Sequence, residues 1–222
     1  MNDRQFVLSL GHRPAFGAAD FIVGAPNREA FAWIERWPDW PARGLVLVGP
    51  PSSGKSHLTA VWQARSGARV VPAAELRVSD ELVTLARSDA VAVEDVDRGV
   101  DERALFHLYN MLRERQGGLL LTGRALPALW PLTLADLRSR IATLPVATLG
   151  SPDDAMLATL TVKLFADRQL LVEAEAVEFL VARIDRSFAA VAAAVAALDH
   201  AALAQGRAVT VPLIRAVLPG LT

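Results

Sequence analysis

The eight residues from Gly49 to Ser56 constrain the fold of this chain more than any other stretch. They read G-P-P-S-S-G-K-S, the pattern G-x-x-x-x-G-K-[ST], between an apolar run at 45–48 and a helix-compatible segment at 57–64. Glycines let such a loop curl until its backbone N–H groups point at a phosphate, and a following helix adds the positive end of its dipole. The pattern therefore predicts a strand, a phosphate-binding loop and a helix, in that order.

Side chains of this loop have separate expected roles. Lys55 would reach the β- and γ-phosphates of a nucleotide, and the Ser56 hydroxyl would sit on Mg²⁺. A plain surface turn rich in glycine and proline is the alternative, which the flanking patterns argue against. We assign nucleotide binding to the loop and the residue after it: Gly49, Pro50, Pro51, Ser52, Ser53, Gly54, Lys55, Ser56 and His57.

Two acids, Glu94 and Asp95, directly follow a second apolar run, which reads as a strand buried on both faces. Placing two carboxylates at the end of a buried strand costs free energy unless they have a partner or a function. In P-loop ATPases one acid here holds Mg²⁺ and the next orients the attacking water. We therefore assign Glu94 and Asp95 as candidate catalytic residues, and Ser56, Glu94 and Asp95 as candidate metal ligands. A strand that dissolves into a polar loop is the alternative.

A third apolar run ends in Thr122, whose hydroxyl at the tip of a neighbouring strand would sense the γ-phosphate. Asp101 is expected to cap the helix between these strands, and Ser79 an earlier helix. From Ser151, at the cap of the next helix with Pro152 in its first turn, the pattern changes. Four helices are expected, at about 152–168, 173–184, 187–205 and 210–218.

The order of these patterns predicts an α/β fold: a P-loop core with a five-stranded parallel sheet between helices, then a small all-α lid domain. We place the core at 14–150 and the lid at 151–222. Residues 1–13 contain Gln5, Phe6, Leu8 and Leu10. They form either a first strand against the core or an exposed peptide that a partner captures.

Composition narrows the function classes. A net charge of −1 provides no overall basic field that would draw the protein onto DNA, and no cysteine is available for disulfides or zinc. No apolar run is long enough to span a bilayer, and the first residues lack the form of a signal peptide. We expect a cytoplasmic protein with no membrane contact and no direct sequence-specific DNA binding.

The whole arrangement resembles the AAA+ ATPases, and its details resemble the DnaA-related members, in particular the Hda family of regulatory inactivators. The resemblance covers nearly the whole chain, which looks like the ATPase core alone. It is carried by Asp20-Phe21-Ile22-Val23-Gly24 with Asn27-Arg28, by Gly54-Lys55-Ser56-His57-Leu58, by Leu121-Thr122-Gly123-Arg124, by Asp136-Leu137-Arg138-Ser139-Arg140, and by Leu198-Asp199 with Val211-Pro212.

The resemblance implies further roles. The backbone at Phe21, Ile22 and Val23 would hold the adenine of ADP or ATP. Arg140 would be an arginine finger that acts on nucleotide in a neighbouring DnaA subunit. Residues 5–10 would be a peptide that docks on the sliding clamp, the beta subunit of DNA polymerase. The family's role is negative regulation of replication initiation at the nucleoid and replisome, with a nucleotide-dependent homodimer as one expected form.

Several positions depart from the family pattern. The acids run Glu94-Asp95 where most AAA+ proteins have Asp-Glu, and Arg124 stands where an aspartate is usual. Ala189 takes the place of an arginine that would contact nucleotide from the lid, so we assign that role to Arg186, one turn away. We expect bound nucleotide with slow or absent hydrolysis by the chain itself. The alternative is an active AAA+ ATPase that loads a helicase or remodels a replication protein.

Overall fold

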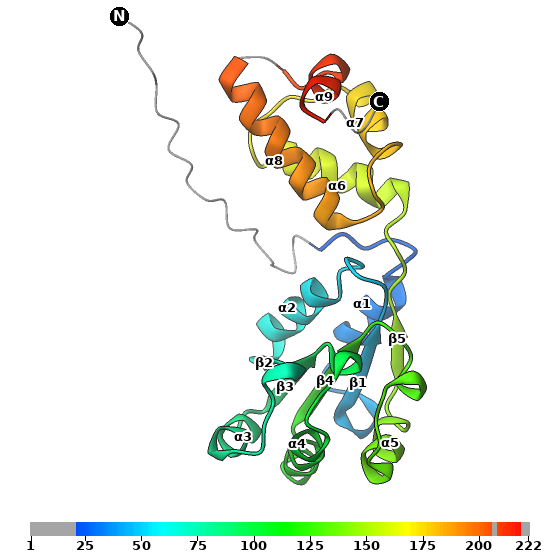
Figure 1. Cartoon of the computed structure of the whole chain (residues 1–222), viewed down its shortest axis with the longest axis vertical. Coiled ribbons are helices and arrows are strands. Elements are labelled where there is room, and N and C mark those ends of the chain that lie inside the picture. Colours follow the sequence, from blue (N-terminus) through cyan, green and yellow to red (C-terminus); the bar gives the residue numbers. More distant parts are fainter. Residues whose placement is uncertain (1–20, 206–207, 219–222) are drawn as a thin grey trace, which may run out of the picture.

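A computed structural model describes residues 21–205 and 208–218 of the chain. An α/β core and a helical lid lie one above the other along the longest axis (Figure 1). The expected clamp-binding residues Gln5, Phe6, Leu8 and Leu10 lie outside the described residues, so the choice between a strand and an exposed peptide stays a prediction. In the described part of the chain, no helix is both long and apolar enough to cross a membrane.

The core is built on a five-stranded sheet with the order β2-β3-β4-β1-β5. All neighbouring pairs are parallel, as the sequence predicts. Strand β4 therefore lies between β1, which leads into the phosphate loop, and β3, which ends in the acids. The strands are β1 (Gly44–Val48), β2 (Arg69–Pro72), β3 (Ala90–Glu94), β4 (Gly118–Gly123) and β5 (Val146–Thr148).

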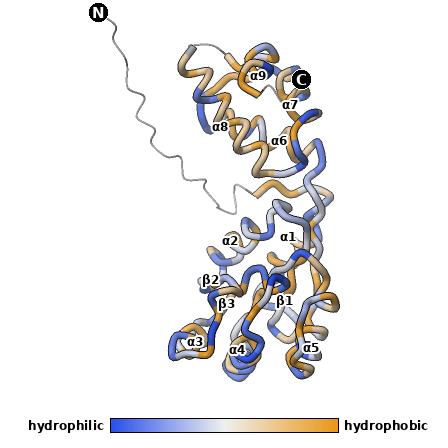
Figure 2. Tube along the Cα trace, viewed as in Figure 1, coloured by the Kyte–Doolittle hydropathy of each residue, from blue (hydrophilic) through white to orange (hydrophobic). Residues whose placement is uncertain are grey.

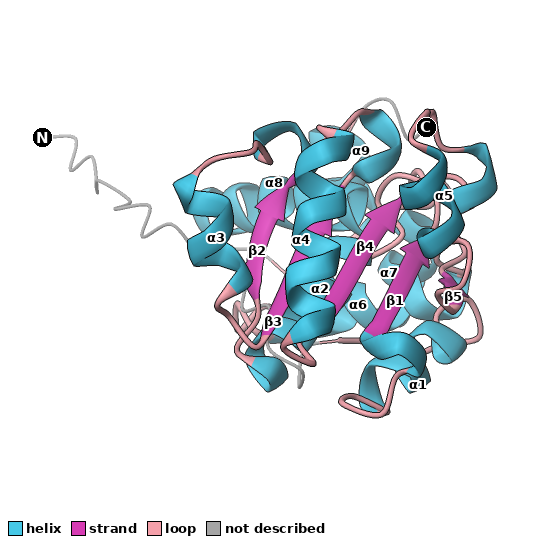
Figure 3. Cartoon of the chain, turned by 90° about the horizontal axis from the view of Figure 1, so that it is seen from below, coloured by secondary structure: helices cyan, strands magenta, loops and turns pink. Residues whose placement is uncertain are grey.

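Helices cover both faces of this sheet (Figure 3). One apolar cluster joins Val91 and Val93 of β3 to three helices: α3 (Asp80–Ala86), α4 (Glu102–Glu114) and α5 (Ala135–Ile141). The other joins Ala90 and Ala92 of the same strand to α1 (Arg28–Glu35) and α2 (Lys55–Ser66). Successive side chains of a strand point to opposite faces, so a strand buried on both sides reads as a continuous apolar run.

After β5 the described chain is helical. The lid helices are α6 (Asp154–Ala166), α7 (Ala174–Val181), α8 (Phe188–Gln205) and α9 (Val211–Val217). They enclose an apolar core of their own, in which Leu157, Leu180 and Leu198 are fully buried. Figure 2 shows how apolar much of α6 and α8 is. The small alanine and valine side chains of α8 let its neighbours pack closely.

Residues 22–27 contact both the connection that leads into the lid and the lid helix α6. Asn27 is buried: its Oδ1 accepts from the Gly24 N–H at 2.8 Å, and its Nδ2 donates to the Ile22 carbonyl at 2.9 Å. The Pro26 carbonyl accepts from the N–H of Gly150 at 2.8 Å. A Cβ atom on Gly24 would lie 2.6 Å from Cγ of Met156, so helix α6 packs directly on this backbone.

The helix starts test the capping predictions. The Asp101 side chain accepts from the N–H groups of Arg103 and Ala104, which confirms this cap. Ser79 occupies the expected position, but its side chain makes no capping hydrogen bond. The predicted start at Ser151 and Pro152 is wrong: helix α6 begins at Asp154, and Oδ1 of Asp153 accepts from the Met156 N–H at 2.8 Å. Two good capping residues stand close together here, and the carboxylate is the one used.

Candidate functional site

The phosphate loop turns at two glycines at the carboxyl end of β1. Gly54 has φ of 98°, a left-handed conformation that costs glycine little, and helix α2 begins directly after it. A Cβ atom on Gly49 would lie 2.5 Å from the Leu149 carbonyl oxygen, so the loop needs glycine at its first position. Between them Ser53 is buried, and its Oγ has no hydrogen-bond partner among the described residues.

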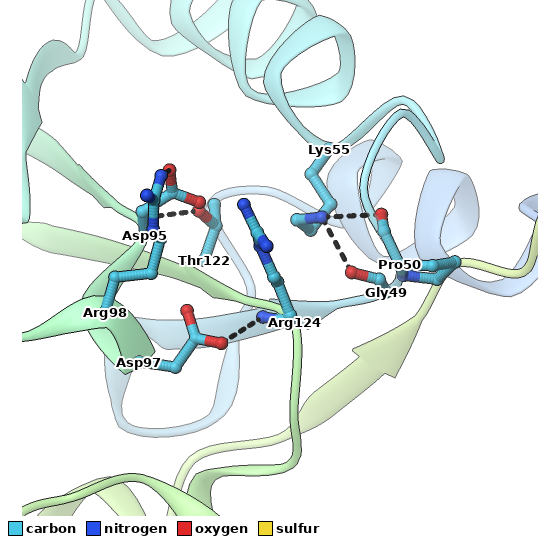
Figure 4. A network of polar contacts seen from close by, with 8 residues as sticks. All are labelled: Gly49, Pro50, Lys55, Asp95, Asp97, Arg98, Thr122 and Arg124. Carbon is cyan, nitrogen blue, oxygen red and sulfur yellow. Dashed lines mark hydrogen bonds and ion pairs between the residues drawn. The ribbon is translucent and has the colours of Figure 1, made fainter. Parts of the chain in front are cut away.

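Lys55 folds back over this loop. Its Nζ donates to the Gly49 carbonyl at 2.7 Å and to the Pro50 carbonyl at 2.9 Å (Figure 4). Burial lowers the pKa of Lys55, the negative charge of Asp95 opposes this shift, and the positive charge of Arg124 adds to it. A phosphate is a stronger acceptor than these neutral carbonyls, so the ammonium is placed to exchange them for an anion.

The two acids at the end of β3 differ in their surroundings. Glu94 continues the alternation of Ala90 and Ala92, which places it on the side of α2. Its Oε1 is buried and has no partner among the described residues. Asp95 has φ of 59°, and its Oδ2 lies 3.6 Å from Nη1 of Arg98 in an exposed ion pair.

Thr122 links the tips of β3 and β4. It is buried, and its Oγ1 accepts a hydrogen bond from the N–H of Asp95 at 3.0 Å. A hydroxyl that accepts one hydrogen bond still has its own proton to donate. The structure thus brings Thr122 and Asp95 together at the edge of the sheet where the phosphate loop begins.

A second link at this edge was not predicted. Oδ2 of Asp97 accepts from the backbone N–H of Arg124 at 2.8 Å (Figure 4). The two residues are 27 positions apart, so no local spacing reveals the pair. The only signal in the sequence is that Arg124 departs from the family pattern.

Aromatic side chains lie beside the loop. The Phe21 ring stacks on Phe31 with a centroid distance of 5.5 Å and meets the His57 ring edge-on at 5.2 Å. A Cβ atom on Gly54 would lie 3.4 Å from Cε2 of Phe188, the first residue of lid helix α8. Phe188 is thus a lid residue at the phosphate loop that sequence reasoning missed.

The predicted adenine segment lies along this aromatic group. Phe21 is buried, Ile22 is half-buried and Val23 is exposed. Arg186 is engaged elsewhere: its Nη2 lies 3.0 Å from Oδ1 of Asp154 at the start of α6, in an exposed pair. Among the described residues, Arg186 forms no hydrogen bond or ion pair with the loop, so its assignment to nucleotide stays a prediction.

Arg140 lies on α5, in the half of the core that is remote from the lid (Figure 1). Its Nη1 donates to Oδ1 of Asn110 at 2.5 Å. The guanidinium carbon lies 4.9 Å from the ring centroid of Phe106 and 5.6 Å from that of Tyr109. Helix α4 therefore holds this arginine in place, apart from the chain's own phosphate loop.

The donor set at the loop fits a nucleotide with Mg²⁺. Within the described ranges, no group of three or more His, Cys, Asp or Glu residues forms a metal site by itself. Mg²⁺ in such proteins takes only one or two protein ligands and shares the phosphates, so such a group is not required. Ser56, Glu94 and Asp95 are the residues that would hold it, and the unpartnered Oε1 of Glu94 suits this use.

In the comparison with known protein families, the match falls on the lid. Residues 153–218 match the family model described as Hda, lid domain. No curated protein sequence matches the chain.

Solved structures share the fold at low sequence identity. Domain III of the replication initiation protein DnaA from Thermotoga maritima is 17% identical, with a TM-score of 0.82 over 94% of this chain and 98% of that one. AMPPCP-bound DnaA from Aquifex aeolicus is 15% identical, with a TM-score of 0.71 over 87% and 67%. The RuvB Holliday junction branch migration motor from T. maritima is 15% identical, with a TM-score of 0.67 over 79% and 61%. The AAA+ fold with a helical lid is thereby confirmed.

Proposed function

We propose that this chain, an AAA+ protein related to DnaA and Hda, is a nucleotide-binding regulator that stimulates ATP hydrolysis by DnaA. Its own nucleotide, ADP or ATP with Mg²⁺, would set the conformation of core and lid. Its arginine finger, Arg140, would act on ATP held by DnaA. Docking on the sliding clamp through residues 5–10 would limit this activity to the replisome, and the result would be negative regulation of initiation.

The placement of Arg140 is the observation that carries this proposal. A guanidinium that acts in another subunit must be held rigidly at the surface and away from its own nucleotide. Arg140 is half-buried against Phe106 and Tyr109 and bonded to Asn110. These contacts reduce the entropy lost when it meets a phosphate, and an arginine finger is worth about 10³ to 10⁵ in rate.

The phosphate loop supports the resident nucleotide. Lys55 supplies the main positive charge, and the N-terminus of α2 directs backbone N–H groups toward the same place. Mg²⁺, when bound, would neutralise charge between phosphate groups. Ser56 and Glu94 are the ligands we favour, and Asp95 the residue that would orient water.

Slow hydrolysis by the chain itself follows from the acids. The carboxylate of Asp95 is about half exposed and faces Arg98. A carboxylate that faces a neighbouring cation is poorly placed to orient an attacking water, and displacement of a catalytic group by about 1 Å can cost about a hundredfold in rate. The chain would therefore keep its nucleotide during many turnovers of its partner. The same would hold for a homodimer of the chain.

The test is reconstituted ATP hydrolysis by DnaA in the presence of clamp loaded on DNA. Arg140→Ala should lower the stimulated rate of ATP hydrolysis by DnaA at least about tenfold, because the charge that develops in the transition state loses its partner. Arg138→Ala is the matched control: it lies on the same helix, and its Nη1 donates to the Leu132 carbonyl at 3.4 Å. Nucleotide binding by both variants should equal that of the wild type.

Two outcomes would contradict the proposal. Stimulation at the wild-type level in Arg140→Ala removes the arginine finger from the mechanism. Rapid ATP turnover by the chain alone, without DnaA, favours the alternative of a loader or remodeller. Clamp binding is tested separately, by comparing Gln5→Ala with the wild type. If Gln5→Ala loses the stimulation of DnaA only under conditions in which stimulation requires the clamp, the two activities are linked.

A further inference from the structure

We propose that Glu102 is a positioning residue for the arginine finger. Its carboxylate fixes the N-terminal end of helix α5, and α5 carries Arg140. Glu102 itself touches no nucleotide and acts only through the direction of this helix. The inference rests on the proposed function, because it gives Glu102 a part in the action of Arg140 on DnaA.

Helix α5 supplies no cap for its own first turn. It has seven residues, and its N-cap residue is Leu134, whose side chain makes no capping hydrogen bond. The first N–H groups of a helix have no partner inside it, and an isolated helix of this length is unstable in water. Groups outside α5 are therefore needed to fix where it starts and in which direction it runs.

Glu102, the first residue of α4, supplies this anchor. Its Oε1 accepts from the N–H and from the hydroxyl of Thr133, both at 2.9 Å, and its Oε2 accepts from the N–H of Leu134 at 2.6 Å. These partners lie 31 and 32 positions away along the chain. Two consecutive N–H groups and one hydroxyl thus converge on a single carboxylate, which restrains the start of α5 more than one hydrogen bond would.

The anchor depends on the ionised form of Glu102. Burial opposes ionisation, but the hydrogen bonds from Thr133 and Leu134 outweigh it and hold the pKa of Glu102 below its ordinary value. Donors that lower a carboxyl pKa stabilise the anion. Hydrogen bonds to a charged acceptor are also roughly twice as strong as those between neutral groups. A neutral side chain at this position would therefore hold α5 less firmly.

Helix α4 thereby fixes both ends of α5. Glu102 holds the N-terminal end, whereas Asn110 and the rings of Phe106 and Tyr109 hold Arg140 near the C-terminal end. The four residues of α4 follow the spacing i, i+4, i+7 and i+8, so they share one face of that helix. Two anchors set the direction of α5, whereas one alone would let the helix pivot about Arg140.

Loss of the anchor should affect the reaction more than the association with DnaA. Arg140 and its contacts on α4 remain at the surface, so the groups that meet the partner are still present. A displacement of about 1 Å at a catalytic group, however, can cost about a hundredfold in rate. An interaction that matters only in the transition state changes the maximal rate and leaves the half-saturating concentration nearly unchanged.

The test is ATP hydrolysis by DnaA, with clamp loaded on DNA, at increasing concentrations of the full chain. Glu102→Ala should lower the maximal stimulated rate about tenfold and change the half-saturating concentration of the chain less than about twofold. Glu102→Gln keeps the length of the side chain and one carbonyl acceptor, so its maximal rate should be intermediate. Glu114→Ala is the control, because Glu114 is an exposed acid at the end of α4, and it should change neither quantity.

The outcomes separate this inference from the proposed function. A wild-type maximal rate in Glu102→Ala, together with a lost rate in Arg140→Ala, overturns the inference alone. No loss in either variant overturns both. A change confined to the half-saturating concentration would make Glu102 part of the contact with DnaA, and so would also refute a positioning role.

Hydrogen exchange checks the anchor without DnaA. In Glu102→Ala the N–H groups of α5 should exchange faster, and those of lid helix α6 should exchange at the wild-type rate. Unchanged exchange in α5 would overturn the inference, because the carboxylate would then not hold the helix. If exchange rises in α6 as well, Glu102→Ala has lost its fold, and the rate of Glu102→Gln decides: a wild-type rate refutes the inference and an intermediate rate supports it.

Discussion

The core and the lid treat their buried polar groups differently. In the lid, the fully buried Thr161 donates its Oγ1 hydrogen to the Leu157 carbonyl at 2.7 Å. No described lid residue has a buried side-chain polar atom without a partner. In the core such atoms occur at Ser53 of the phosphate loop, at Glu94 and Asp97 after β3, and at Thr59 and Trp62 of α2.

The difference separates a packing domain from a ligand-binding one. A buried polar group without a partner costs about 1–3 kcal/mol, and a ligand that pairs it recovers this free energy. Ser53 belongs to the phosphate loop, and Glu94 and Asp97 lie at the end of β3 and in the turn that follows it. Thr59 and Trp62 belong to the helix beneath, and nothing in the structure explains their unpaired atoms. Nucleotide should therefore stabilise the core directly and the lid only through contacts such as Phe188.

The chain has two lysines, one in each part, and they provide the largest test of this contrast. Lys55→Ala should weaken nucleotide binding about a hundredfold or more, since two or more charge-assisted hydrogen bonds to phosphate are lost. Lys163→Ala is the matched control in the lid, where Nζ of Lys163 binds Asp167 at 3.0 Å. Titration with fluorescent ADP measures both, and equal losses would refute the assignment of binding to the core.

The pH dependence of binding tests the buried ammonium. Burial lowers the pKa of Lys55 in the free protein below the ordinary value of 10.5. A bound phosphate favours the charged form, so affinity should be constant below that lowered pKa and fall about tenfold per pH unit above it. Lys55→Arg should show no such fall, because guanidinium stays charged. Titrations from about pH 7 to pH 10 decide this, and parallel profiles would exclude Lys55 as the titrating group.

Helix caps give the smallest effects and test whether core and lid unfold separately. Asp101→Ala in the core and Asp153→Ala in the lid should each cost about 1 kcal/mol of unfolding free energy. Ser79→Ala should cost less than about 0.5 kcal/mol, since its side chain makes no cap bond. Hydrogen exchange should rise in α4 for the first variant and in α6 for the second. A uniform rise in both would show one cooperative unit.

Much of the fold is encoded locally and was predictable. Apolar runs marked strands buried on both faces, and glycines marked the loop before α2. The Asp101 cap followed from its position, because its carboxylate reaches N–H groups of the next turn. The predicted start of α6 was wrong because Ser151 and Asp153 are both suitable N-cap residues, and the sequence alone does not show which of them is used. Helix α5 was too short to give a clear period.

The site was predictable where chemistry is local and not where the fold joins distant segments. The loop and its lysine form one motif. By contrast, Asn110 holds Arg140 from 30 positions away, and Asp97 fixes Arg124 from 27. Phe188 reaches Gly54 across the boundary between core and lid. Such contacts depend on the order of strands and the position of the lid, which residue spacing does not contain.

The hydrogen bond from Gly150 to Pro26 has a mechanical consequence. It fastens the connection to the lid at one point, beside the segment on which α6 rests, and so defines a fulcrum. Helix α8 has 18 residues and is about 27 Å long. A rotation of about 10° at the fulcrum would move a point at that distance by about 5 Å. The hydrogen bond thus fixes the point about which such a rotation of the lid would turn, and Phe188 at the start of α8 is the lid residue that meets Gly54 of the phosphate loop.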